Sequence, residues 1–414
     1  MPVAGPALIV CTETRNRRGR RVPPLPEVRG LAALLVGLCL ALTGCTAADR
    51  LADAVGAAEI AVVIAPQSWD VAVMAGRIVL IGPDNSLSKL DTAGIDTPRL
   101  VWGEAGLAFS DRGQDYVLSS SLRATPRSVA ASTQTGIYPG AVNGEFIGVF
   151  NAGFVAAGYR FDVTTFGPRG SVTRPLDGMA DAIGGCGSSY FAITHPSMAQ
   201  SRTHRIVALP AGSVAAARPI GRSSDGVTIG GLNYRTPCVN DQLLVLHGDD
   251  DARPDRPPTS SPDDDLVPGF LTVADVRSGS LRLIELKGAD GHPRQFARAA
   301  ISRPQYAATT ISDGYVSWVA GDGVVYRTAV KDGSTRQVRA GLPRVGLDNA
   351  IYSFEGDQAF VLTGLGSDGD GIRLVTYRVR DWELVSTREL PGLAEMRTGF
   401  GFIQDFAVRP VRRT

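Results

Sequence analysis

Histidine side chains are the groups in this sequence best suited to binding a transition metal or to moving a proton near neutral pH. The chain has four of them, at positions 195, 204, 247 and 292. No two share a spacing such as HxxxH, which would direct two imidazoles at one ion. His195 and His292 each precede a proline, which predicts loop positions with solvated rings. The sequence therefore predicts no metal site and no cofactor.

Motifs of nucleophilic or nucleotide-dependent catalysis are missing from the sequence. There is no GxSxG elbow, and the nearest Gly/Ser cluster, 184–188, leads into a predicted strand. Neither GxxxxGK[ST] nor a strand-linked GxGxxG occurs, so no phosphate-binding loop is predicted. Acidic stretches at 249–251 with 263–265, and at 367–371, lack the ligand spacing of a calcium loop. We expect them to be solvated loops.

An uncharged apolar run, 31–42, follows Arg29. It is shorter than the roughly 20 residues of a membrane-spanning helix, and it has the length of a signal-peptide hydrophobic region. The run ends in Leu42-Thr43-Gly44-Cys45, which resembles the lipobox of bacterial lipoproteins. The resemblance implies that Cys45 carries diacylglycerol, becomes the mature amino terminus and anchors the chain to the membrane. The alternatives are an ordinary secretory signal and a buried core helix.

This interpretation divides the chain into three parts. Residues 1–44 form the signal peptide, whose long Arg- and Pro-rich beginning is either a disordered leader or lies upstream of the true start. Residues 45–57 form a lipidated tether. Residues 58–410 form the main domain, which carries a polar insertion at 249–266 and is expected on the extracytoplasmic face of the cell membrane.

The five cysteines agree with export. Cys11 and Cys39 leave with the leader and Cys45 is acylated, so Cys186 and Cys238 remain. An even pair in an oxidising compartment predicts a disulfide. Two separate buried thiols are the alternative.

A tight turn followed by a short apolar strand recurs along the mature chain. Dipeptides such as Asn-Gly and Asp-Gly supply the positive φ that hairpin turns need. Residues 60–414 show no convincing amphipathic helix. A repeat of about 45 residues is typical of a four-stranded propeller blade. The turns lie at 75–76, 112–113, 143–144, 187–188, 240–241, 313–314 and 356–357.

The repeat predicts an all-β fold, a β-propeller of seven blades, with six or eight as alternatives. Residues 60–65 are expected beside 400–408, where they would close the ring and leave no open sheet edge. The chain resembles extracytoplasmic seven-bladed propellers only loosely, because repeated WD dipeptides and Kelch double glycines are missing. A pair of β-sandwiches is the alternative architecture.

In a propeller, the loops that enter the innermost strands gather at one face. Five such loops begin at or near a proline and carry charged or aromatic side chains. Loops on a rigid scaffold are where binding usually resides, whereas inter-blade ion pairing is the alternative role for any one residue. The candidate rim residues are Trp69, Asp70, Asp177, Asp181, Arg303, Arg344, Asp348, Glu395 and Arg397.

The charge balance excludes nucleic acid as the partner. Residues 1–44 hold six Arg and two Glu of the 42 basic and 41 acidic residues, so the remainder is close to neutral. Our leading hypothesis is a lipid-anchored binding or scaffolding protein that uses its rim for an envelope protein or a small ligand. The alternatives are a lactonase-like propeller hydrolase with a channel-bound cation, and a structural envelope protein without a ligand.

Overall fold

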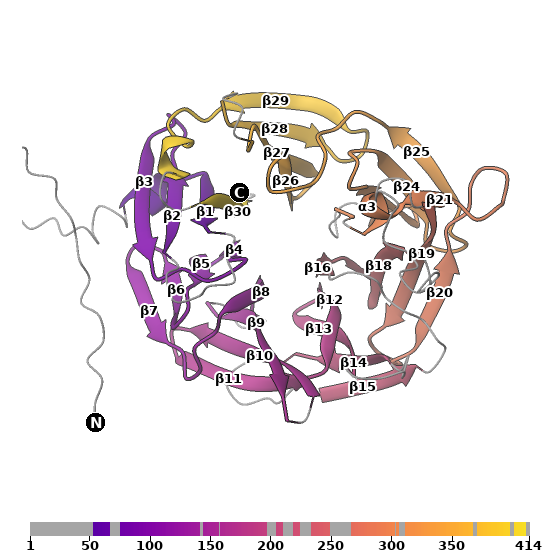
Figure 1. The fold of residues 1–414 in the computed structure, drawn as a ribbon, viewed down its shortest axis with the longest axis horizontal. Helices are drawn as coiled ribbons and strands as arrows, with labels where there is room; N and C mark the ends of the chain where they lie inside the picture. Colours follow the sequence, from indigo (N-terminus) through magenta and orange to yellow (C-terminus); the bar gives the residue numbers. More distant parts are fainter. Residues whose placement is uncertain are drawn as a thin grey trace, which may run out of the picture. The chain divides into compact units, whose positions relative to one another are not determined.

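The computed structural model describes residues 53–66, 75–140, 144–156, 158–196, 204–209, 218–223, 233–248, 266–302, 304–305, 311–366, 371–397 and 401–410. These residues belong to one compact unit, Ala47–Thr414. Seven small sheets stand around a common axis in this unit, which is a seven-bladed β-propeller (Figure 1). The predicted fold class is therefore confirmed.

In blades 1, 2, 4, 5 and 6 the chain enters at the innermost strand and moves outward through antiparallel neighbours. Blade 3 follows the same outward order, and a later strand is added on the inner side of its first strand. Blades 1 and 2 consist of β4 (Leu100–Gly103), β5 (Gly106–Ser110), β6 (Gln114–Leu118) and β7 (Leu122–Pro126), and of β8 (Thr133–Pro139), β9 (Phe146–Val155), β10 (Gly158–Gly167) and β11 (Gly170–Asp177). Blade 3 consists of β12 (Met179–Cys186), β13 (Ser189–His195), β14 (His204–Ala208) and β15 (Arg218–Ser223), with β16 (Asn233–Thr236) added parallel to β12.

Blades 4 to 6 repeat this order. Blade 4 consists of β17 (Cys238–Val239), β18 (Gln242–Gly248), β19 (Leu266–Asp275) and β20 (Leu281–Glu285), with β21 (Gln295–Ala297) paired to β19. Blades 5 and 6 consist of β22 (Ile311–Ser312), β23 (Tyr315–Val319), β24 (Val325–Ala329) and β25 (Thr335–Arg339), and of β26 (Ala350–Glu355), β27 (Gln358–Thr363), β28 (Arg373–Arg378) and β29 (Glu383–Glu389).

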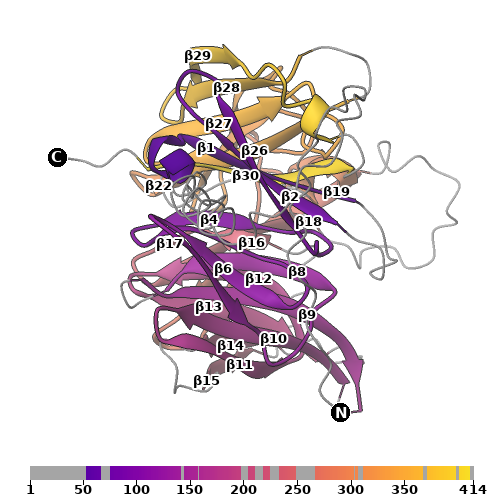
Figure 2. The same ribbon diagram turned by 90° about the vertical axis from the view of Figure 1, so that its left-hand side faces the viewer.

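The seventh blade joins the two ends of the domain. Its innermost strand, β30 (Phe402–Val408), pairs antiparallel with β1 (Ile60–Ala65), and β2 (Gly76–Ile81) and β3 (Leu87–Thr92) complete the sheet. The register runs from Ile60 opposite Val408 to Ala65 opposite Phe402. The side view shows β1 and β30 together (Figure 2). The predicted closure is confirmed, and it satisfies the backbone groups of both strands.

The recurring turns occupy two different places within a blade. Those at 143–144, 187–188, 240–241, 313–314 and 356–357 lie between the first and second strands of blades 2 to 6. The turns at 75–76 and 112–113 lie between the second and third strands of blades 7 and 1. This different position within the blade is one reason why the spacing of the turns in the sequence is uneven. Positive φ angles at Asn240, Asp313 and Gly356 explain the residue types at these turns.

The disulfide joins neighbouring blades. Cys186 ends β12 and Cys238 begins β17, and their Cα atoms are 5.2 Å apart across a sequence separation of 52. The predicted pairing is confirmed.

Replacing both Cys186 and Cys238 by Ser should lower the free energy of unfolding by about 4 kcal/mol, because the unfolded chain regains the freedom that a closed loop of this length removes. Urea unfolding measures the difference. A reducing agent should destabilise the wild type by a similar amount and leave the double variant unchanged. A double variant as stable as the wild type would contradict this expectation.

Helical structure is minor. Short helical segments include residues 53–57, α3 (Arg298–Ile301) and the 3-10 turn η3 (Glu395–Arg397). Among the described residues, no helix has the length and apolar character needed to cross a bilayer. The leader, Cys45 and most of the polar insertion, 249–265, lie outside the described residues.

Candidate functional site

The predicted rim residues were expected in connections that lead into innermost strands, and we call the end of the ring where these strands begin the rim face. Arg344, Asp348, Glu395 and Arg397 lie in such connections, whereas Asp177 ends β11 and Asp181 lies within β12. Positions 69 and 70 fall between β1 and β2, the second and third strands of blade 7, so the prediction that their loop enters an innermost strand is wrong. Trp69, Asp70 and Arg303 lie outside the described residues. Asp177, Arg344, Asp348 and Glu395 are exposed. Arg397 donates a hydrogen bond to the carbonyl oxygen of Leu365, at 2.8 Å. Among the six described candidates no hydrogen bond or ion pair joins two of them, so they do not form one polar cluster.

Among the six described rim candidates, Asp181 is the one whose side chain is buried. In β12, Ala180 lies opposite Thr194 and Ala182 lies opposite Ile193, which makes Asp181 the extra residue of a β-bulge. A bulge turns a side chain out of the regular alternation of a strand. Asp181 is 6% exposed, and its carboxylate lies beside the last residue of β13 and the first residue of β14.

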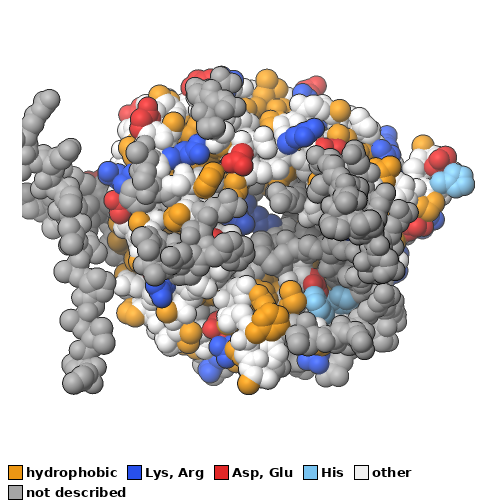
Figure 3. Space-filling view, in the orientation of Figure 1, with side chains coloured by type: hydrophobic (Ala, Val, Ile, Leu, Met, Phe, Trp, Pro, Cys, Tyr) orange, Lys and Arg blue, Asp and Glu red, His pale blue; other side chains and the backbone are white. Residues whose placement is uncertain are grey.

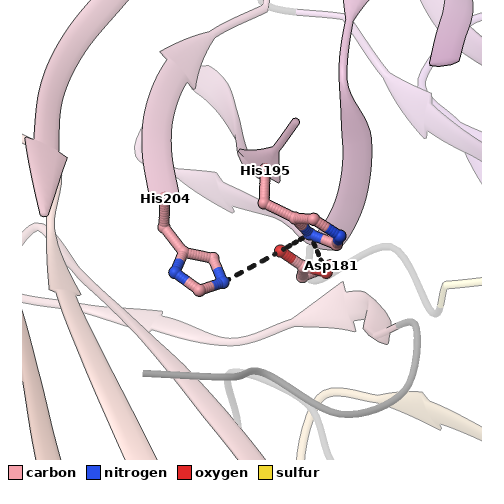
Figure 4. Close-up of side chains that lie close together, drawn as sticks. All are labelled: Asp181, His195 and His204. Atoms are coloured by element: carbon pink, nitrogen blue, oxygen red, sulfur yellow. Dashed lines mark hydrogen bonds and ion pairs between the residues drawn. The ribbon is translucent and has the colours of Figure 1, made fainter. Parts of the chain in front are cut away.

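These two residues are His195 and His204 (Figure 4). Nδ1 of His195 lies 2.8 Å from each oxygen of the Asp181 carboxylate. Nε2 of His204 lies 3.5 Å from Oδ2 of Asp181. The imidazole rings are 5.7 Å apart at 61°. One ligand atom from each of the three residues falls within 4.8 Å of the others.

The protonation of this cluster is coupled. Burial raises the pKa of Asp181, and the hydrogen bond from His195 and the charges of both histidines oppose that rise. The hydrogen bond to Asp181 raises the pKa of His195, whereas partial burial lowers it. The carboxylate and the His195 ring therefore stabilise each other's charged forms.

The prediction that His195 is a solvated loop residue is wrong. His195 still pairs with Met179 in the sheet, and its side chain is hydrogen-bonded to a carboxylate and 29% exposed. The following proline ends the strand but does not move the ring into solvent. The sequence carries no local signal for this site, because its three residues meet across two hairpins and one bulge.

The remaining histidines occupy other environments. His292 is exposed in a turn, as predicted. His247 is buried in β18, where its Nδ1 lies 3.0 Å from the carbonyl oxygen of Gly248 and its Nε2 lies 2.9 Å from Oγ1 of Thr272. These contacts give His247 a structural role.

An exposed aromatic side chain lies at the same end of the ring, in the neighbouring blade 2. Phe154, at the end of β9, is 68% exposed and contacts the ring of Tyr159 edge-on at 5.0 Å. The carbonyl oxygen of Tyr159 accepts a hydrogen bond from Gly178, the residue before β12. Hydrophobic side chains beside histidine side chains are visible in the space-filling view (Figure 3). The rim face therefore combines an apolar tip and a preorganised polar cluster in one sector.

In the central channel, a buried carboxylate is paired with arginine side chains. Asp405 in β30 is 1% exposed and pairs with Arg235 at 3.0 Å and Arg99 at 4.0 Å. A cavity of about 190 Å³ lies where innermost strands end, and its lining includes Trp102, Tyr138 and Phe354. Among the described residues, three or more His, Cys, Asp or Glu side chains come within metal-ligand distance at Asp181, His195 and His204 and at no place in the channel.

Comparisons with known proteins bear on the fold. No family model matches the chain, and no curated protein matches it. Among solved structures, the chain is similar to the cobalt-substituted ACO of Synechocystis, with 9% identity, a TM-score of 0.48 and coverage of 85% of this chain and 93% of that one. It is also similar to apo AztD from Citrobacter koseri, with 11% identity, a TM-score of 0.43 and coverage of 84% of this chain and 88% of that one. A functionally unknown protein from Desulfotomaculum acetoxidans is similar to the chain with 11% identity, a TM-score of 0.43 and coverage of 85% of this chain and 100% of that one. All three TM-scores lie below 0.5, so the assignment of a seven-bladed propeller rests on the arrangement of this chain's own sheets.

Proposed function

We propose that this protein is a lipid-anchored binding protein of the cell envelope, and that it binds a ligand on the rim face at blades 2 and 3. One observation carries the proposal: buried Asp181 meets His195 and His204 on the rim face, where the neighbouring blade presents the exposed ring of Phe154. Side chains held on strand ends keep their geometry before a ligand arrives, which reduces the entropy cost of binding. The ligand is an envelope protein or a small molecule.

A hydrolase with a cation in the channel has less support. Such a cation needs several oxygen ligands that converge on one point. The buried channel carboxylate of Asp405 is instead paired with two arginines. We therefore prefer binding at the rim to catalysis in the channel.

The anchor is tested by replacing Cys45 with Ser. Without the sulfur, diacylglycerol cannot be attached, so the variant should lose lipid labelling and leave the membrane fraction. Metabolic labelling with a fatty-acid analogue, fractionation and intact-mass measurement check this result. A variant that stays in the membrane at the wild-type processed mass would refute anchoring at Cys45.

Rim binding is tested by placing a photo-cross-linking phenylalanine analogue at position 154 in cells. We expect a discrete adduct, because a ligand bound at the cluster would cover the Phe154 ring. The same analogue at Leu384, which is 57% exposed on the outer strand β29, is the matched control. The adduct at 154 should disappear when His204 is replaced by Gln. Equal adducts at both positions, or none at 154, would count against rim binding.

A further inference from the structure

We infer that Asp181, His195 and His204 form a binding site for a divalent first-row transition metal, with Zn²⁺ as the reference ion. This inference rests on the proposed function, because it names the class of ligand for the same sector of the rim face. It assigns the three side chains as metal ligands and leaves at least one coordination position open.

The distances suit such an ion. Zinc bonds of about 2.0–2.2 Å to nitrogen and oxygen in a tetrahedral arrangement separate the ligand atoms by roughly 3.3–3.5 Å. His204 Nε2 and Asp181 Oδ2 are 3.5 Å apart, and His195 Nδ1 and Asp181 are 2.8 Å apart. The three ligand atoms fall within 4.8 Å of one another. Small side-chain rotations would bring all three into the first coordination shell, and the ion would replace the hydrogen bond between His195 and Asp181.

The ligand types select the class of metal. Two imidazoles and one carboxylate suit zinc, iron, cobalt, nickel or copper, whereas calcium and magnesium prefer sites made of oxygen atoms. The set also contains no sulfur, because both cysteines of the domain form the disulfide at the far end of β12. The site is therefore expected to discriminate against calcium and magnesium.

Two of the proposed ligand side chains are buried and one is partly exposed, so the site is both preorganised and accessible. Asp181 and His204 are 6% and 3% exposed. The residues on both sides of Asp181 pair with β13, and His204 pairs with Ser223. The His195 side chain is 29% exposed, so solvent reaches the cluster at this residue. Three protein ligands with an accessible fourth position are typical of sites that hold a water molecule or accept a donor from a ligand. The exposed Phe154 on the same face of the neighbouring blade would provide an apolar contact for a ligand that extends across blades 2 and 3.

The test is titration of the untagged full-length protein, purified in detergent and stripped with a chelator. We expect one equivalent of Zn²⁺ by calorimetry and one equivalent of Co²⁺ with the intense visible bands of a four- or five-coordinate ion. Replacing His204 with Gln or Asp181 with Asn should weaken binding by at least about 100-fold, since loss of even an outer partner costs 10–100-fold. Replacing His292 with Gln removes a histidine outside the site and should change nothing.

Folding is monitored by circular dichroism and by the heat-unfolding temperature without metal. Zn²⁺ should raise that temperature for the wild type and for the His292 variant but not for the His204 variant, because an ion that binds the folded state stabilises it. Absence of stoichiometric binding to the wild type would overturn the inference. So would equal binding by the His204 and Asp181 variants, or equal loss in the His292 variant. If metal binding fails while the adduct at position 154 forms, the rim binds a ligand of another class and the proposed function stands.

Discussion

Replacing Arg127 with Met is expected to lower the free energy of unfolding by about 3–5 kcal/mol, because it leaves the Asp115 carboxylate buried without its charged partner. Nη2 of Arg127 lies 2.9 Å from Oδ1 of Asp115, and the two side chains are 1% and 0% exposed. The guanidinium also lies over the ring of Phe150 in blade 2, 3.8 Å from its centroid. The pair therefore connects blades 1 and 2. Denaturant unfolding measures the loss.

The pH dependence of this variant has a definite sign. Burial raises the pKa of Asp115, and the charge of Arg127 opposes that rise. Without Arg127, the folded-state pKa rises further above the unfolded value. The variant's loss of free energy of unfolding should be complete above the folded-state pKa of Asp115. It should shrink as the pH falls below that value, and it should vanish below the unfolded-state pKa of Asp115, where both states hold the proton.

A double variant is the control for this prediction. Replacing Asp115 with Leu together with Arg127 with Met removes both charges, so it should recover part of the lost stability and abolish the additional pH dependence. Recovery should be incomplete, because Arg127 also donates a hydrogen bond to the carbonyl oxygen of Asp111, at 2.8 Å. An Arg127 variant as stable as the wild type at neutral pH would show that the pair contributes little.

Ending the chain after Phe400 is expected to prevent stable folding, because it removes β30 and opens the ring between blade 6 and the remaining strands of blade 7. Ile403 and Phe406 in this strand are 1% and 0% exposed. Loss of two such side chains costs about 2–5 and 3–5 kcal/mol, which is comparable to the 5–15 kcal/mol total stability of many proteins. The truncation also exposes the backbone edge of β1 and removes the Ala407 carbonyl that accepts from Trp102 Nε1.

The matched control ends after Pro410. It keeps β30 and Arg409, whose backbone N–H donates to the carbonyl oxygen of Glu59 at 2.7 Å. Yield, circular dichroism and protease resistance should match the full chain for this control and be lost for the shorter one. A synthetic peptide of residues 401–410 should restore protease resistance to the shorter chain. A shorter chain that folds without the peptide would contradict closure through β30.

Local sequence patterns were sufficient for much of the architecture. Turn dipeptides followed by short apolar strands predicted the blades, since hairpin geometry depends on positive φ at adjacent residues such as Asn240 and Asp241. The strand pattern at 60–65 and 400–408 predicted ring closure, because two unpaired edges in a propeller must meet. The cysteine count predicted the disulfide between Cys186 and Cys238, which the structure confirms.

Local sequence patterns did not predict most of the contacts in the candidate site. Asp181 was predicted as a rim residue, but the partners of its carboxylate depend on a bulge in β12 and on the ends of β13 and β14. The loop assignment of His195 was wrong because proline predicts where a strand ends and not which way the preceding side chain points. The buried pair of Asp115 and Arg127 was equally unpredictable, since burial depends on contact with the next blade.

The sequence by itself determined that the main domain is a ring of small β-sheets, because strand period and turn chemistry are properties of consecutive residues. Tertiary structure alone decided which side chains share a site. Asp181, His195 and His204 are separated by 14 and 9 positions and meet at less than 5 Å. Only the pairing of three strands, with one extra residue in the first, brings their polar atoms to one point.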